Sequence, residues 1–191
     1  MITGRRRYEH PFQPPAGSGD RRCRGGLVAD AGGPGRTTAA GGPQQIQVPD
    51  GNKVFLVGHA VGVQIYSCNA TPSGFVWGFV APRANLYDDH GKLIITHFAG
   101  PTWQAMAGSR VVGQLVDFVT VDPTAIAWVL LSASTTPGPD GDRLVATTFV
   151  QRIATTGGLA PPAADCNAAT AGTVAEVPYT ADYYFWKHTD G

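Results

Sequence analysis

Alternation of apolar and polar residues is the clearest pattern in the chain, and it is most regular at residues 61–68. There Val61, Val63 and Ile65 fall on one face of an extended segment and Gln64 falls on the other. A period of two residues is typical of a β-strand with one buried and one exposed face. This segment therefore predicts a half-buried strand that ends near Cys68.

Further short runs of apolar, β-branched and aromatic residues are bounded by turn-forming residues. The first apolar run ends at Gly58, and Gly91 suits the positive φ that a short hairpin loop requires after Asp88. Asp122 could cap a short helix, although the apolar run that follows also fits a buried strand. The runs predict strands at residues 54–57, 75–80, 85–87, 92–96, 110–119, 126–131, 144–153 and 177–186.

About eight strands at short spacing predict an all-β fold, either an antiparallel sandwich or a barrel, with long Gly/Pro-rich loops. Composition agrees, because only 15% of the residues are charged while the chain has 25 Gly and 15 Pro. No apolar run approaches the roughly 18 residues of a membrane-spanning helix. We expect a single β-rich domain over residues 46–188 and no transmembrane segment.

Residues 1–45 differ from the rest of the chain, because they have no apolar periodicity and are rich in Arg, Gly and Pro. Arg5, Arg6 and Arg7 could form an arm for nucleic acid or a membrane surface, but this composition favours a solvated, disordered tail. Translation of a GC-rich gene in the wrong reading frame would also produce a sequence of this composition. Residues 51–191 hold seven bases and ten acids, a balance that argues against a nucleic-acid partner.

Several kinds of catalytic site are excluded by missing motifs. The chain has no GxGxxG for a dinucleotide, no GxSxG serine elbow and no CxxC for a zinc ribbon. It also has no HxH or HxxxH pair, so a metal site would have to be assembled by the fold from separate segments. We expect no cofactor and no metal. His97, in the stretch THFAGPTW, could act with a nearby carboxylate such as Asp117 or Asp182, but a buried histidine bonded to the backbone is the commoner arrangement.

Aromatic side chains are a second group of candidate binding residues. On the last predicted strand, Tyr184 and Trp186 fall on the face opposite Tyr183 and Phe185. With Trp103 they could form a platform for a small molecule, a glycan or a protein, although aromatic packing within a core is the commoner use of such residues.

The chain has three cysteines: Cys23 in the N-terminal tail, and Cys68 and Cys166 at the ends of predicted elements. Cys68 and Cys166 could form a disulfide or remain two buried thiols.

Four motifs resemble a known family. GVQIYSC (62–68), HFAGPTW (97–103) with GSRVVG after it, FVQRIATTGG (149–158) and VPYTADYYFW (177–186) are similar to the domain of unknown function 3455, over about residues 48–186. Relatives are secreted bacterial and fungal proteins that usually begin with a signal peptide, which this chain lacks, as a misplaced start would explain. The family commonly has an acidic residue where this chain has Ala107, and it has no established catalytic residues.

The resemblance implies a Cys68–Cys166 disulfide and a secreted or periplasmic location. We favour a non-catalytic module that binds a ligand or partner. The alternative is a hydrolytic or metal-dependent enzyme that uses His97 with a carboxylate.

Overall fold

The structure, a computed structural model, describes residues 42–189. Most of the predicted tail, including Arg5, Arg6, Arg7 and Cys23, lies outside these residues. The described elements are η1 (Gln44–Ile46), β1 (Asn52–Thr71), β2 (Gly74–Tyr87), β3 (Leu93–Phe98), β4 (Thr102–Ala105), β5 (Arg110–Val119), β6 (Trp128–Thr136), β7 (Phe149–Gly157), η2 (Ala163–Asp165) and β8 (Val174–His188).

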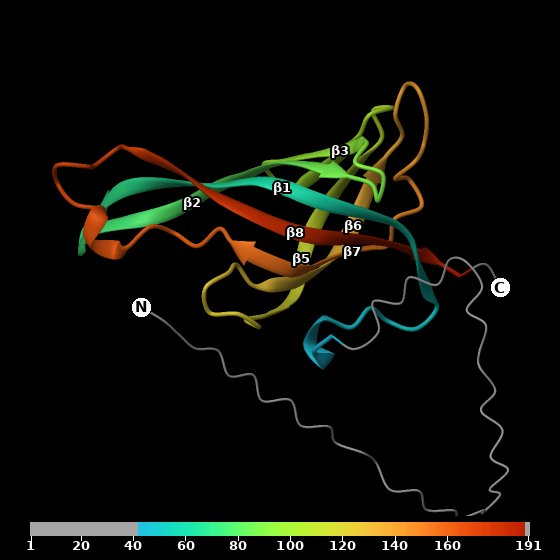
Figure 1. The fold of residues 1–191 in the computed structure, drawn as a ribbon, viewed down its shortest axis with the longest axis horizontal. Helices are drawn as coiled ribbons and strands as arrows, with labels where there is room; N and C mark the ends of the chain where they lie inside the picture. Colours follow the sequence, from blue (N-terminus) through green and yellow to red (C-terminus); the bar gives the residue numbers. More distant parts are fainter. Residues whose placement is uncertain (1–41, 190–191) are drawn as a thin grey trace, which may run out of the picture. The chain divides into compact units, whose positions relative to one another are not determined.

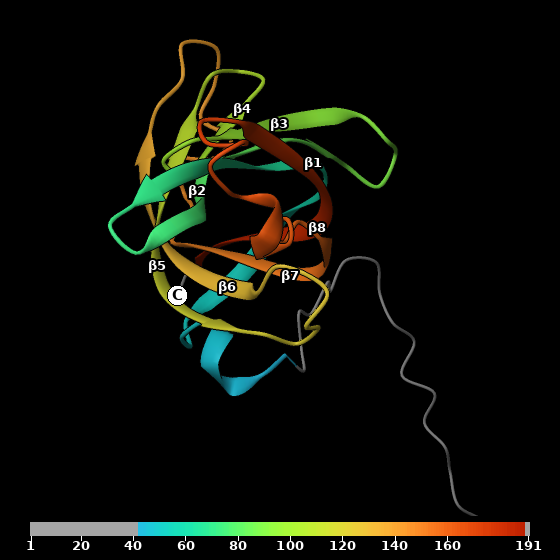
Figure 2. The ribbon, with the colours of Figure 1, turned by 90° about the vertical axis from the view of Figure 1, so that its left-hand side faces the viewer.

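The eight strands form one antiparallel sheet, which confirms the all-β prediction. Each strand pairs with the next along the chain, and β8 returns to pair with β1, so the sheet closes on itself as a barrel (Figures 1 and 2). Of the two predicted alternatives, the closed single sheet is the one present. No helix within residues 42–189 is long and apolar enough to cross a membrane.

The first strand is longer than predicted. β1 continues through Gly58, where the sequence indicates an end, because β8 pairs with it on one side almost without interruption. Glycine also serves close packing here: a Cβ at Gly62 would lie 2.2 Å from the Arg83 carbonyl oxygen of β2. The long strands β1, β2 and β8 therefore run side by side over most of their length (Figure 1).

Two other segments differ from the prediction. Residues 144–147, expected at the start of a strand, form a turn in which the Thr147 amide donates to the Leu144 carbonyl, and β7 begins at Phe149. Asp122 is followed by a turn rather than a helix, and its carboxylate accepts from the backbone amide and the hydroxyl of Thr124.

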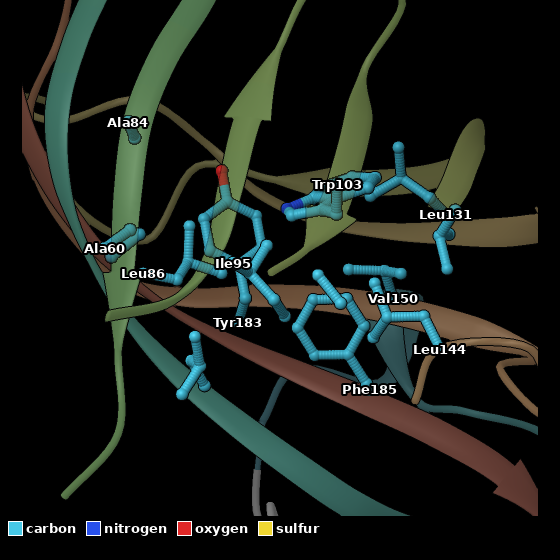
Figure 3. Close-up of a cluster of buried hydrophobic side chains, with 14 of the residues drawn as sticks. Ala60, Ala84, Leu86, Ile95, Trp103, Leu131, Leu144, Val150, Tyr183 and Phe185 are labelled. Carbon is cyan, nitrogen blue, oxygen red and sulfur yellow. The ribbon is translucent and has the colours of Figure 1, made fainter. Parts of the chain in front are cut away.

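The hydrophobic core lies inside the ring. Tyr183 and Phe185 of β8 are almost fully buried together with Trp103 of β4, and aliphatic residues from the other strands surround them (Figure 3). β8 alternates as predicted, with Tyr179, Ala181, Tyr183 and Phe185 inside. Burial of side chains of this size contributes about 1.5–3 kcal/mol each.

The buried face of β1 is the one that the sequence marks as polar. Gln64 is only 3% exposed, whereas Val61 is 59% exposed. Tyr66 and Cys68 lie on the inner face with Gln64. The interior of the ring therefore receives a polar side chain that a purely apolar core would exclude.

The short strands β3 and β4 close the ring over only part of its length. β3 pairs with β2 at residues 84–87, and β4 pairs with β5 at residues 110–112. Within residues 42–189, β2 before residue 84 pairs only with β1, and β5 beyond residue 112 pairs only with β6. Two strand edges, residues 75–82 and 113–119, are thus left without a strand partner.

A disulfide joins Cys68 near the end of β1 to Cys166 just after η2. The pairing that the resemblance implies is therefore present. It ties the long β7–β8 connection to the tip of the β1–β2 hairpin, and the Cys68 amide also donates to the Thr173 carbonyl.

Candidate functional site

A cavity of about 230 Å³ lies within the ring. Every strand contributes at least one side chain to its wall, so the closed sheet itself builds the site. The lining residues are Gln64, Phe79, Val80, Pro82, His97, Gly100, Pro101, Trp103, Leu115, Val129, Leu131, Arg152 and Tyr183.

Three of the residues that line the cavity from the two unpaired strand edges are largely exposed, whereas Pro82 is buried. Phe79 and Val80 of β2 are 58% and 54% exposed, and Leu115 of β5 is 56% exposed, yet all three line the cavity. The β3–β4 turn supplies Gly100 and Pro101. These positions indicate a mouth between β2 and β5 with an apolar rim.

Two nitrogen atoms on the lining residues are buried without a hydrogen-bond partner. They are Nε2 of Gln64 and Nε1 of Trp103, both of which can only donate. An unpartnered buried donor costs about 1–3 kcal/mol, so such groups in native proteins are normally met by water or by a ligand. Two residues of the cavity wall therefore have a buried donor that no protein group satisfies.

His97 forms part of the wall in its neutral form. Its side chain is 3% exposed and stacks on the Trp103 ring, with centroids 4.4 Å apart. Nδ1 lies 2.9 Å from the Thr102 carbonyl oxygen; because a carbonyl only accepts, Nδ1 carries the proton and donates. Burial lowers the pKa of His97 from 6.5 to about 4.

Arg152 of β7 is the one cation among the lining residues. Its Nε and Nη2 both donate to the Ala127 carbonyl, at 3.2 and 2.7 Å. Among residues 42–189, no carboxylate forms an ion pair with it. Burial raises the pKa values of Tyr66 and Tyr179 overall, and the charge of Arg152 partly opposes this effect. At His97, burial lowers the pKa and the charge of Arg152 lowers it further.

The two carboxylates considered as partners of His97 lie elsewhere. Asp117 is exposed on β5, where it accepts from the Phe118 amide at 2.7 Å. Asp182 is on the outer face of β8 and binds His59, while its neighbour Tyr183 points inward and contacts the His97 ring. The structure therefore does not bring His97 together with either carboxylate.

His59 lies instead between two carboxylates on the outer surface. Nε2 is 2.8 Å from Asp89 Oδ1, and Nδ1 is 2.7 Å from Asp182 Oδ1. The hydrogen bond to Asp89, then that to Asp182, holds the pKa of His59 above 6.5. This cluster ties the β2–β3 turn to β1 and β8. In the described part of the chain, no three His, Cys, Asp or Glu side chains form a group suited to a metal ion.

The three aromatic residues considered for binding occupy two different places. Trp103 is 1% exposed and lines the cavity. Tyr184 and Trp186 are half-buried on the outer face of β8, and the indole nitrogen of Trp186 is itself buried without a partner. They do not form one platform with Trp103.

Gln64 and Arg152 were not singled out by the sequence. Gln64 stands between Val63 and Ile65, and Arg152 follows Gln151 in the segment FVQRI. A polar residue in a strand is ordinarily placed on the exposed face. The sequence pattern therefore predicts that the side chains of Gln64 and Arg152 lie on the outer surface.

The comparisons with known proteins agree with the motifs. No curated protein and no solved structure matches the chain. Residues 49–187 match the model of a family described as protein of unknown function (DUF3455). This match covers most of the chain and includes every strand, and the chain therefore belongs to the DUF3455 family.

Proposed function

We propose that this domain binds a small, mainly apolar molecule in the cavity between β2 and β5. The observation that carries the proposal is a cavity with apolar walls that also contains two unpartnered buried donors, Gln64 Nε2 and Trp103 Nε1. Pockets that bind small molecules have this composition, with a few polar groups that orient the ligand.

The cavity volume limits the size of the ligand. A dry engineered cavity of about 150 Å³ binds benzene. A cavity of about 230 Å³ therefore suits a molecule with one ring or two fused rings, or a short branched chain. Glycans of several units are too large to enter it.

The disulfide supports the proposal that the domain, residues 46–188, acts outside the cytoplasm. Disulfides such as Cys68–Cys166 persist mainly in oxidising compartments. Mass spectrometry of the protein isolated from its own cells without reductant checks this, and finding both thiols free would contradict it.

Titration of ¹⁵N-labelled protein with indole tests the binding function. We expect saturable shifts of the Trp103 indole and Gln64 side-chain amide signals. Val129→Phe adds a ring to a lining residue and should abolish these shifts. Val61→Phe makes the same change at an exposed position outside the cavity and should leave them intact.

Absence of saturable shifts in the wild-type protein at millimolar indole would overturn the proposal. Equal binding by the Val129→Phe variant would place the site elsewhere on the molecule.

A further inference from the structure

We infer that the ligand carries a single carboxylate, which Arg152 binds at the inner part of the cavity. This inference rests on the proposed binding function and names the chemical class of the ligand. Three observations support it: the cation without a competing anion, the unused donors, and the charge and size of the acceptor that the cavity can hold.

The first observation is an uncompensated cation beside an apolar cavity. Arg152 is part-buried, and no Asp or Glu is among the lining residues. Withdrawing a charge from water is costly unless an opposite charge or several hydrogen bonds compensate for it. Within residues 42–189, the Ala127 carbonyl is its only hydrogen-bond partner.

The second observation is the set of donors that remains. A guanidinium has five N–H hydrogens in a planar fork, and the Ala127 carbonyl engages Nε and Nη2 only. No described residue accepts a hydrogen bond from Nη1. Gln64 Nε2 and Trp103 Nε1 are also without a partner, so three of the lining residues have unused donors.

The third observation concerns the charge and size of that acceptor. One cation matches one negative charge, and hydrogen bonds to an ionised acceptor are about twice as strong as neutral ones. A dianionic phosphate would face only one cation and the apolar side chains of Val129 and Leu131. A small apolar acid, aromatic or branched, fits both the charge and the volume.

Calorimetric titration with benzoate and with benzamide, its uncharged counterpart of the same shape, tests the inference. We expect the wild-type protein to bind benzoate at least tenfold more tightly than benzamide, with a preference that weakens as salt concentration rises. Arg152→Gln should remove the preference. Arg83→Gln, which removes an exposed arginine paired with Glu176 on the surface, should leave it unchanged.

The outcomes separate the inference from the binding function. Equal affinity for benzoate and benzamide in the wild type, or binding of indole but of neither benzoate nor benzamide, would overturn the carboxylate assignment and leave the binding function standing. Failure of all three probes would overturn the function itself.

A preference that persists in a folded Arg152→Gln protein would overturn the role of Arg152. Circular dichroism establishes whether that variant folds. The preference for benzoate over benzamide is measured first on the wild-type protein. The carboxylate assignment can therefore be contradicted even if the Arg152→Gln variant does not fold.

Discussion

His97 shows how a single histidine can stabilise the ring only while it is uncharged. The imidazole is enclosed by Trp103, Tyr183 and the β3–β4 turn, and the positive charge of Arg152 adds to the cost of protonating it. Its hydrogen bond to the Thr102 carbonyl is already made by the neutral form. The residue therefore serves packing and turn geometry, and it contributes an uncharged surface to the cavity.

The lowered pKa of His97 predicts a loss of stability in mild acid. The unfolded chain takes up a proton near pH 6.5, whereas the folded protein resists protonation down to about pH 4. The free energy of unfolding should therefore fall as the pH drops through this window, by up to about 3 kcal/mol from this residue. His97→Phe should flatten that part of the profile in urea unfolding measured from pH 7 to pH 4.5.

His90→Phe, which places the same ring in the exposed β2–β3 turn, is the matched control. Equal flattening in both variants would contradict the assignment to His97. His59 acts in the opposite direction, because its pKa is raised and its contribution is lost above pH 6.5. Comparing each variant with the wild-type protein separates the two effects.

At the scale of elements, the lengths of neighbouring strands decide where the ring is open. β1, β2 and β8 are long, whereas β4 spans only Thr102–Ala105. A strand of this length cannot pair along the whole of β5, so the edges of β2 and β5 separate beyond it. The mouth of the cavity is therefore a consequence of strand length.

The disulfide stabilises the far end of these long strands. Cys68 and Cys166 are 98 residues apart, and closing a loop of about this length contributes up to roughly 4.7 kcal/mol in the chain-entropy model. The double variant Cys68→Ser/Cys166→Ser should lower the free energy of urea unfolding by about 3–5 kcal/mol.

Dithiothreitol should destabilise the wild-type protein by a similar amount and leave the double variant unchanged. A loss below about 1 kcal/mol in the double variant would contradict a main stabilising role for the bridge.

The sequence predicted some of these elements because their apolar residues follow a simple period. The inward face of β8, with Tyr179, Tyr183 and Phe185, is confirmed for this reason. The inner face of β1 could not be predicted, because the more apolar side chains of Val61 and its neighbours lie outside or half-exposed while Gln64 is inside. Which face of such a strand is buried depends on the elements that pack against it, and the two-residue period alone does not identify these elements.

The candidate site was harder to predict than the fold. His97 and Trp103 were noticed because they stand beside a Gly-Pro turn, and both line the cavity. Arg152 and Gln64 become site residues only once the ring closes and places β1 beside β8 and β8 beside β7. No local pattern contains that information.

At the scale of the whole molecule, the open edges expose apolar side chains as well as backbone. Val116 and Phe118 of β5 are 54% and 57% exposed, and Val76 of β2 is 51% exposed. An unpaired edge with apolar side chains is a site at which protein chains associate. The edges that border the mouth of the cavity therefore also offer an apolar surface for association.

This arrangement predicts that charge on β5 reduces self-association. Val116→Lys/Phe118→Lys should raise the temperature at which light scattering begins on heating. Val61→Lys/Val174→Lys removes apolar residues of similar exposure from β1 and β8, which pair with each other there, and should have a smaller effect. Equal improvement by both pairs would show that general hydrophobicity, rather than the open edge, drives association.

The position of the disulfide in the chain has a further consequence. All strands from β2 to β7 lie between Cys68 and Cys166. A peptidase that cuts any loop in this interval leaves two fragments that the disulfide still joins covalently. The strands of the two fragments therefore remain close to one another. A molecule nicked in this interval therefore stays in one piece as long as the disulfide is intact.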